Sequence, residues 1–145
     1  MTQPVLLSLQ PRFANALLSG SKTIEVRRRF PAVSPGTTVV IYSSSPQKAV
    51  LGTMHVEFTQ KESTVNIWHD FREEIGISRS ELYGYLKGLT EGYVIKLNNP
   101  IKWQTSITLS ELRTEIGIEP AQSFRYLTLQ QLRKIQRLVY LGSMV

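Results

Sequence analysis

The sequence predicts an α+β fold, a small mixed β-barrel with peripheral short helices and a C-terminal amphipathic helix. Segments with the two-residue period of strands and segments with helical spacing follow each other without the regular alternation of a doubly wound sheet. The spacing of the strands along the chain also favours a small barrel. Finally, Gly52 falls in the middle of one strand. A glycine there indicates a bulge or a sharp bend, which a closed barrel needs.

Length and composition suit one soluble domain. A chain of 145 residues can bury a real core but is short for two domains. We expect one domain over 1–145, with a core over 5–127 and a C-terminal helix over 128–140. Apolar residues make up 41% and charged residues 19%, as in ordinary soluble proteins. No apolar run approaches the roughly 20 residues that cross a bilayer, and the N-terminus lacks the basic region of a signal peptide. These features predict a cytoplasmic protein without a membrane partner.

The sequence offers little metal or cofactor chemistry. It has no cysteine, which excludes disulfides, thiolate chemistry and zinc sites built from cysteine. The two histidines, His55 and His69, are not joined by HxH or HxxxH spacing. We expect no metal and no cofactor. The net charge of +6 instead favours a polyanionic partner, nucleic acid before membrane.

The N-terminal part predicts a strand, a short helix and a second strand. The first strand covers 5–9, and Pro11 suits the first helical position. Gly20 then ends a helix whose apolar face is formed by Phe13, Ala14, Leu17 and Leu18. Further strands are expected over 38–42 and 48–58. In the latter, Val50, Gly52, Met54, Val56 and Phe58 share one side, and Ala49, Leu51, Thr53, His55 and Glu57 share the other.

The middle of the chain predicts two helices. Helical spacing over 64–75 defines an apolar line of Val65, Trp68, Phe71 and Ile75, and Gly76 closes the helix. Ser78 and Glu81 then form a capping box for a second helix. That helix runs to Gly88 and carries the apolar residues Leu82, Tyr85 and Leu86.

The C-terminal part predicts a strand over 93–97, a turn at 98–100 and a shorter strand over 101–103. A second capping box, Thr108 with Glu111, begins a short helix, and a last strand covers 124–127. Thr128 and Gln131 cap the final helix, whose apolar line is Leu129, Leu132, Ile135, Leu138 and Val139. Arg133, Lys134 and Arg137 lie off that line. Its apolar face is expected to pack on the barrel; a dimer interface and a DNA recognition helix are the alternatives.

A cationic stretch over 19–30, SGSKTIEVRRRF, is the main candidate for function. Strand alternation places Lys22 on the same side as Ile24 and Val26. Thr23, Glu25 and Arg27 share the other side. A lysine on an apolar side needs a pocket or a partner carboxylate, unless its ammonium reaches solvent at the strand end. Both interpretations stay open.

Four motifs in this order resemble the ASCH family: LLSLQPRFANALLSGSKTIEVRRRFP, VVIYSSSPQKAVLG, GYVIKL and PAQSFRYL. The resemblance covers 6–127 and is to the branch described as predicted transcriptional regulators. It implies a PUA-like barrel with a cleft suited to RNA or a modified nucleoside. Gln10 departs from the family, where relatives in this branch often carry a basic residue.

The resemblance also implies a catalytic set. Some family members are described as amidohydrolases that act on N4-acetylcytidine with a lysine, a threonine and a glutamate. The lysine matches Lys22, whereas Glu25 stands at the threonine position. The family's glutamate falls nearest Glu73 or Glu74. The catalytic candidates are therefore Lys22, Glu25 and Glu74. The alternative is that Lys22 and Glu25 form a plain salt bridge at the barrel mouth.

For binding, cations could contact phosphates, aromatic rings could stack on bases, and hydroxyls could donate hydrogen bonds. The predicted ligand-binding set is Lys22, Thr23, Glu25, Arg27, Arg28, Tyr42, Ser44, Lys48, Ser123 and Tyr126. Our first hypothesis is an RNA- or nucleotide-binding PUA-like module with a basic cleft. The second is a hydrolase in the same cleft, either an N4-acetylcytidine amidohydrolase or a metal-independent ribonuclease. The third is a DNA-binding transcriptional regulator. The oligomeric state stays open.

Overall fold

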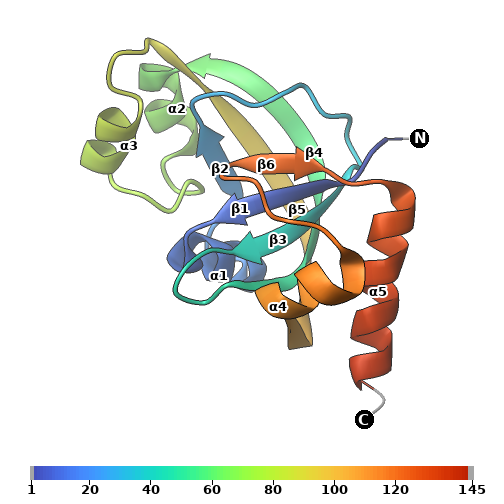
Figure 1. Ribbon diagram of the computed structural model, residues 1–145. Coiled ribbons are helices and arrows are strands. Elements are labelled where there is room, and N and C mark those ends of the chain that lie inside the picture. Colours follow the sequence, from blue (N-terminus) through green and yellow to red (C-terminus); the bar gives the residue numbers. More distant parts are fainter. Residues whose placement is uncertain (1, 144–145) are drawn as a thin grey trace.

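A curled, six-stranded mixed sheet forms the centre of the computed structural model, which describes residues 2–143 (Figure 1). The strand order is β2-β5-β4-β3-β1-β6. β1 and β3 pair in parallel, and the other neighbours pair antiparallel. The strands are β1 (Val5–Leu9), β2 (Ile24–Arg27), β3 (Thr38–Ser43), β4 (Ala49–Ser63), β5 (Glu91–Thr108) and β6 (Phe124–Tyr126). Since β2 and β6 are edges that do not pair with each other, the sheet is a half-barrel and not the closed barrel that we expected.

Helices surround this half-barrel (Figure 1). α2 and α3 lie together at one end of the sheet, and α5 lies on the far side from them. α1 packs on β3, β4 and β5. The helices are α1 (Pro11–Ser19), α2 (Thr64–Phe71), α3 (Arg79–Tyr85), α4 (Leu109–Glu111), which continues as a π-helix over Leu112–Ile116, and α5 (Leu129–Ser143). Within residues 2–143, no helix is both long enough and apolar enough to span a bilayer.

Local signals predicted both ends of α1 and the starts of α3, α4 and α5. Pro11 begins α1, and Gly20 ends it with a φ of 87°, a backbone conformation that glycine adopts without a steric cost. The capping boxes of Ser78 with Glu81 and Thr108 with Glu111 are both formed. At the start of α5, Thr128 and Gln131 exchange the same two hydrogen bonds. These predicted caps are confirmed.

The bulge predicted at Gly52 is present, but its consequence for the strand was missed. The pairing of β4 with β5 shifts register between Val50 and Gly52. Because a bulge adds one residue, the side-chain alternation changes phase across it. Leu51 therefore packs in the same core cluster as Met54, while Val50 packs in a different one. The predicted assignment of alternate residues to two continuous faces is wrong beyond the bulge.

Residues 98–100 continue the strand β5 and do not form the predicted turn. Opposite them, Thr53 pairs with Ile101 while His55 pairs with Asn98. Asn99 and Pro100 thus lie opposite the single residue Met54 in a second bulge, and Asn99 has a φ of 53°. Asparagine tolerates this left-handed conformation better than most residues do. Residues 98–100, Asn-Asn-Pro, therefore form a bulge within the long strand β5 and not a turn between two strands.

The helix expected over 64–75 is shorter and is rotated about its axis from the predicted orientation. α2 ends at Phe71, and Val65, which we placed on the apolar line, is 64% exposed. Ile67 is fully buried in its place, against α3 and β5 residues. In α3, Leu82 is buried as predicted, but Tyr85 is 41% exposed. Tyr85 is therefore available to a ligand and is not a core residue.

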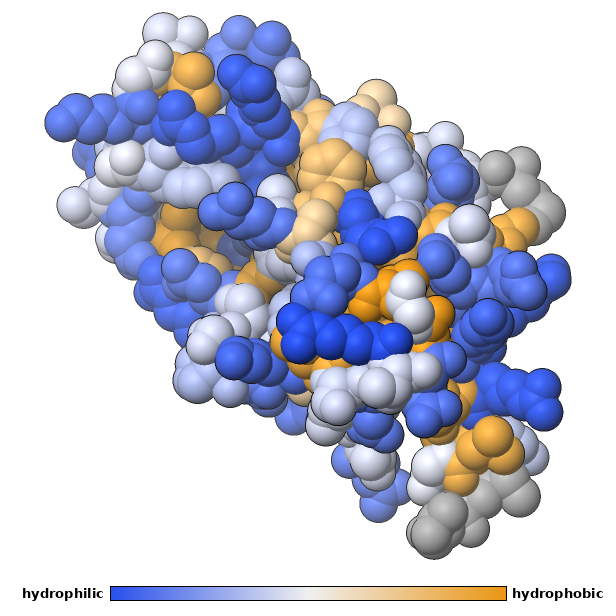
Figure 2. Space-filling model, viewed as in Figure 1, coloured by the Kyte–Doolittle hydropathy of each residue, from blue (hydrophilic) through white to orange (hydrophobic). Residues whose placement is uncertain are grey.

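The C-terminal helix packs on the sheet through its apolar face. Leu132 and Ile135 are buried in a cluster with Leu6 and Val40 of the sheet. This packing is the first of the three interpretations of that face, and it is confirmed. Hydrophilic side chains cover most of the molecular face seen in Figure 2, and hydrophobic atoms show only in small patches.

Candidate nucleotide-binding site

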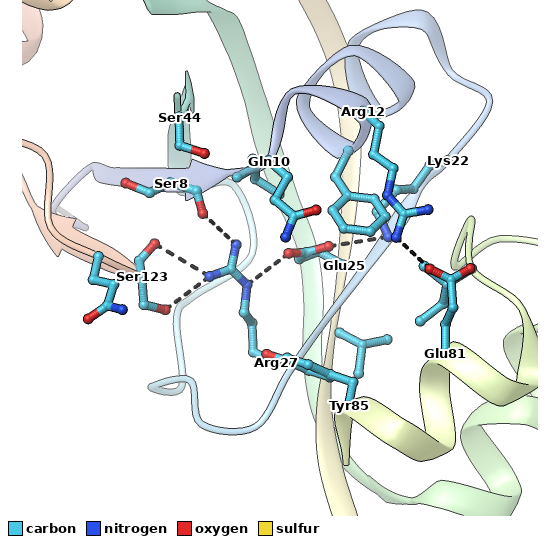
Figure 3. Close-up of a pocket in the computed structure, with 15 residues that line it drawn as sticks. Ser8, Gln10, Arg12, Lys22, Glu25, Arg27, Ser44, Glu81, Tyr85 and Ser123 are labelled. Carbon is cyan, nitrogen blue, oxygen red and sulfur yellow. Dashed lines mark hydrogen bonds and ion pairs between the residues drawn. The ribbon is translucent and has the colours of Figure 1, made fainter. Parts of the chain in front are cut away.

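A cavity of about 600 Å³ opens where the two edges of the half-barrel approach each other. β1 and β2 line it together with α1, α3 and the segment before β6 (Figure 3). Its lining includes three cations and two carboxylates, so one positive charge is in excess. The polar and aromatic residues of the lining are Ser8, Gln10, Arg12, Phe13, Lys22, Glu25, Arg27, Ser44, Glu81, Tyr85, Gln122 and Ser123.

A buried array of three charges forms one wall of this cavity. Glu25 lies between Lys22 and Arg27 (Figure 3). Its Oε1 is 3.2 Å from the Lys22 Nζ, and its Oε2 accepts a hydrogen bond of 2.8 Å from the Arg27 Nε. Each of these three residues is at most 8% exposed. Charges this deeply buried are stable only when they are paired and hydrogen-bonded, which this arrangement achieves.

Lys22 lies just before β2, which begins at Ile24. Its stem packs against Gly76, and its buried ammonium meets the Glu25 carboxylate. A partner carboxylate, and not escape to solvent at the strand end, therefore accounts for this lysine. Its ammonium also donates to the carbonyl of Ile75 and lies 5.0 Å from the centroid of the Phe13 ring. Burial lowers the pKa of Lys22 below its ordinary 10.5, and Glu25 opposes this shift.

Arg27 connects the two edges of the half-barrel. From β2, its guanidinium donates to the Ser8 carbonyl of β1 at 2.8 Å and to the Ser123 hydroxyl at 3.0 Å. Ser123 directly precedes β6. The array of Lys22, Glu25 and Arg27 therefore lines the cavity, and through Arg27 it also links β2 to the opposite edge of the sheet.

Arg12 and Glu81 form an ion pair that joins α1 to α3 beside the cavity (Figure 3). The hydrogen bond from Arg12 holds the pKa of Glu81 below its ordinary value. Glu81 also accepts the backbone hydrogen bond of Ser78 in the α3 capping box. The Glu81 carboxylate thus caps α3 and also holds Arg12 in place beside the cavity.

Five of the predicted site residues line this cavity: Lys22, Glu25, Arg27, Ser44 and Ser123. Thr23 and Glu74 do not. Thr23 donates to Glu74 at 3.1 Å, and Lys96 pairs with the same carboxylate. The hydrogen bond from Lys96 is the main reason that the pKa of Glu74 is lowered. Glu25, and not Glu74, is the carboxylate that faces Lys22.

The remaining predicted residues lie elsewhere. Tyr42 is buried in the core beneath α5, where burial raises the pKa of its hydroxyl. Lys48 and Tyr126 are exposed outside the lining. Arg28 lines an adjoining hollow. Tyr42 and Tyr126 were predicted as stacking groups because unpaired bases stack on aromatic rings, but the face that each side chain occupies depends on sheet register.

Sequence reasoning missed the contributions of α1 and α3. Arg12 and Phe13 follow Pro11 in the first motif, and a basic residue next to an aromatic one was the only available signal. The sequence indicated only a capping role for Glu81, and it indicated Tyr85 only as one of the apolar residues of its helix. Among residues 2–143, no three His, Cys, Asp or Glu residues lie close enough together to hold a metal ion.

Comparisons with known proteins identify the family. The model of the family "Domain of unknown function (DUF365)" matches residues 2–118. An "ASCH domain-containing ribonuclease" of Zymomonas mobilis is 30% identical over 142 residues, which cover 97% of this chain and 93% of that protein. This chain is an ASCH domain protein of the DUF365 family.

The crystal structure of ASCH from Zymomonas mobilis superposes on this ASCH domain with a TM-score of 0.88, at 28% identity over 94% of this chain and 95% of that one. A serine-to-alanine variant of the same protein gives a TM-score of 0.87. The curled half-barrel is therefore the ASCH fold, and it is consistent with the PUA-like superfamily. A ribosomal protein uL22 of Ureaplasma parvum is 22% identical over 126 residues, which cover only 40% of that longer protein.

Proposed function

We propose that this ASCH domain protein binds RNA and holds one nucleotide in the cavity beside Lys22, Glu25 and Arg27. The observation that carries the proposal is the buried charge array with its excess of positive charge. Inside a protein, such fixed charges act on a ligand more strongly than they would in water. A base edge or a phosphate oxygen that enters the cavity would meet groups that are already oriented.

The size and lining of the cavity support a nucleotide. Its volume of about 600 Å³ lies within the roughly 300–1,000 Å³ of typical ligand pockets. Tyr85, half-exposed on the lining, supplies a ring on which an unpaired base can stack. RNA is favoured over DNA because the Zymomonas mobilis relative is named a ribonuclease. For the same reason, a DNA-binding regulator is the weaker hypothesis.

Binding of single-stranded RNA at low and moderate salt tests this proposal. We expect an affinity that falls with salt, as phosphate contacts require. Lys22→Met, which removes the buried charge but keeps most of the side-chain volume, should weaken binding at least tenfold. Because this variant could also disturb folding, Gln10→Trp provides a second test. Gln10 is exposed at the cavity and makes no side-chain cap for α1, so a large ring there should block entry without touching the array.

Gln136→Trp, an exposed change on α5 outside the cavity lining, is the matched control and should bind like the wild type. The proposal fails if the wild-type protein binds no RNA at low salt. It also fails if Gln10→Trp and Gln136→Trp bind equally well.

RNA cleavage in the same cavity is our second candidate, because of the relative's name and because acid and base groups meet there. In a metal-independent reaction the ribose 2′-oxygen bonds to phosphorus while the bond to the leaving 5′-oxygen breaks. A carboxylate, Glu25 or Glu81, would accept the 2′-hydroxyl proton, Lys22 would protonate the leaving oxygen, and Arg27 would stabilise the added negative charge. Incubating end-labelled RNA with the protein in a chelator tests this, and intact RNA at high protein concentration would rule it out.

Amide hydrolysis of N4-acetylcytidine has less support. The proposed set of Lys22, Glu25 and Glu74 does not converge, since Glu74 bonds to Thr23 and Lys96 away from the cavity. Following the ultraviolet spectrum of N4-acetylcytidine with the same protein sample separates this activity from RNA cleavage.

A further inference from the structure

A second hollow of about 400 Å³ adjoins the cavity. It is lined by Arg27, Arg28, Arg29, Tyr85, Leu89 and Ser123. Arg27, Tyr85 and Ser123 also line the first cavity. The two hollows therefore share a wall, and a ligand that fills one of them can extend into the other.

The two hollows differ in how their charges are balanced. In the cavity, Glu25 and Glu81 lie beside the cations and pair with them. In the second hollow, the described lining contains three guanidinium groups and no carboxylate. Arg27 pairs with Glu25, which it shares with Lys22, whereas Arg28 and Arg29 have no partner of opposite sign among the described residues. Such a surface selects an anion, whereas the cavity offers both donors and acceptors, as the edge of a base requires.

Arg28 gives the second hollow a defined wall. Its guanidinium donates to the carbonyls of Tyr85 at 2.7 Å and Lys87 at 3.1 Å, at the C-terminal end of α3. Its backbone N–H also donates to the Tyr85 hydroxyl at 3.3 Å. These bonds hold both the arginine and the shared tyrosine in place.

Arg29 is the group that is available to a ligand. It is exposed, and it makes no hydrogen bond or ion pair with any other residue of the described chain. A free guanidinium presents paired N–H donors that match two oxygens of a phosphate.

We infer that the second hollow is a phosphate subsite, which binds the backbone phosphate next to the nucleotide held in the cavity. The inference rests on the proposed function and makes it more specific: the ligand is an RNA strand of at least two nucleotides and not a free nucleoside. Arg29 contacts the phosphate, Arg28 shapes the wall, and Tyr85 separates the base from its neighbouring phosphate.

The test uses Arg29→Gln and its matched control, Arg133→Gln, which removes one exposed positive charge from α5. The probe is a single-stranded RNA with methylated 2′-hydroxyls, so that cleavage cannot interfere. We expect Arg29→Gln to weaken binding about fivefold at low salt and to reduce the slope of log affinity against log salt by about 0.7, the value for one lost contact to a single strand. Arg133→Gln should change neither quantity. Arg29→Glu should bind more weakly still.

Equal losses in Arg29→Gln and Arg133→Gln, or an unchanged salt slope, would overturn the inference, because only overall charge would then matter. If Gln10→Trp weakens RNA binding while Arg29→Gln matches its control, the cavity binds RNA and only the phosphate subsite is wrong. If the wild-type protein binds no RNA, the proposed function and this subsite fail together.

Discussion

Glu81 is a carboxylate at a site proposed for an anionic ligand, and its partner Arg12 is one of the cavity's three cations. A phosphate that approaches Arg12 must compete with Glu81 for the same guanidinium. The pair is largely exposed, so solvent and salt weaken it and exchange of partners costs little. We therefore expect Glu81 to limit the affinity of the cavity for RNA, in addition to its role in capping α3.

Changing Glu81 to Gln tests whether Glu81 competes with the ligand for Arg12, without removing the cap of α3. Glutamine at this position keeps the capping box, because its amide oxygen accepts the same backbone hydrogen bond from Ser78. With Arg12 released, RNA should bind about twofold to fivefold more tightly at low salt, as measured by fluorescence anisotropy.

Glu111→Gln makes the identical change in the capping box of α4, outside the cavity lining. Its affinity for RNA should equal that of the wild type. Weaker binding by Glu81→Gln, or equal tightening in both variants, would contradict this role for Glu81.

The bulged pair β4 and β5 shapes the sheet at the level of elements. Register shifts occur at three places between these two long strands. Bulges bend a strand and increase its twist, so one continuous pair can curl around the core without a break. Gly52 makes this possible, because a side chain there would overlap the carbonyl oxygen of Ile101 on the paired strand.

Gly52→Ala should therefore lower the free energy of unfolding by about 3 kcal/mol, since backbone cannot easily move away from the added methyl group. Urea unfolding followed by circular dichroism measures this. Gly84→Ala is the control: Gly84 lies inside α3 with open space around it. Alanine there should stabilise the protein by about 0.5–1 kcal/mol. A Gly52→Ala protein as stable as the wild type would show that the bulge can relax.

At the scale of the whole molecule, the Arg27 side chain connects the two sheet edges that no backbone hydrogen bonds join. The edges β2 and β6 share no hydrogen bonds, and Arg27 reaches across from β2 to Ser8 and Ser123. Its planar guanidinium serves Glu25 and both serines at once. A lysine ammonium has no such fork and cannot reproduce this geometry.

Arg27→Lys keeps the positive charge and tests the hydrogen bonds that Arg27 makes to Glu25, Ser8 and Ser123. We expect the free energy of unfolding to fall by about 2–3 kcal/mol, because hydrogen bonds from a buried charge are lost. Arg113→Lys, in the exposed pair with Glu119, should leave the urea midpoint nearly unchanged. Equal midpoints for the two variants would mean that Arg27 contributes nothing to closure.

The sequence predicted those parts of the fold that depend on neighbours along the chain. The strand over 5–9, the start and end of α1 and the three capped helices all rest on residues within four positions of one another. The bulge at Gly52 was also recognised, yet its effect on Met54 and Val56 was not, because a phase change is visible only against the paired strand. For the same reason, the Asn99-Pro100 bulge was misread as a turn.

By itself, the sequence determined the α+β class, the ASCH resemblance and the concentration of charge at Lys22, Glu25 and Arg27. Only the tertiary structure decided which groups meet around the cavity. It brought Arg12, Glu81 and Tyr85 to the site and placed Glu74 outside it. The physical reason is that the half-barrel leaves a gap between its edges, and α1 and α3 meet beside that gap through an ion pair between residues far apart in the chain.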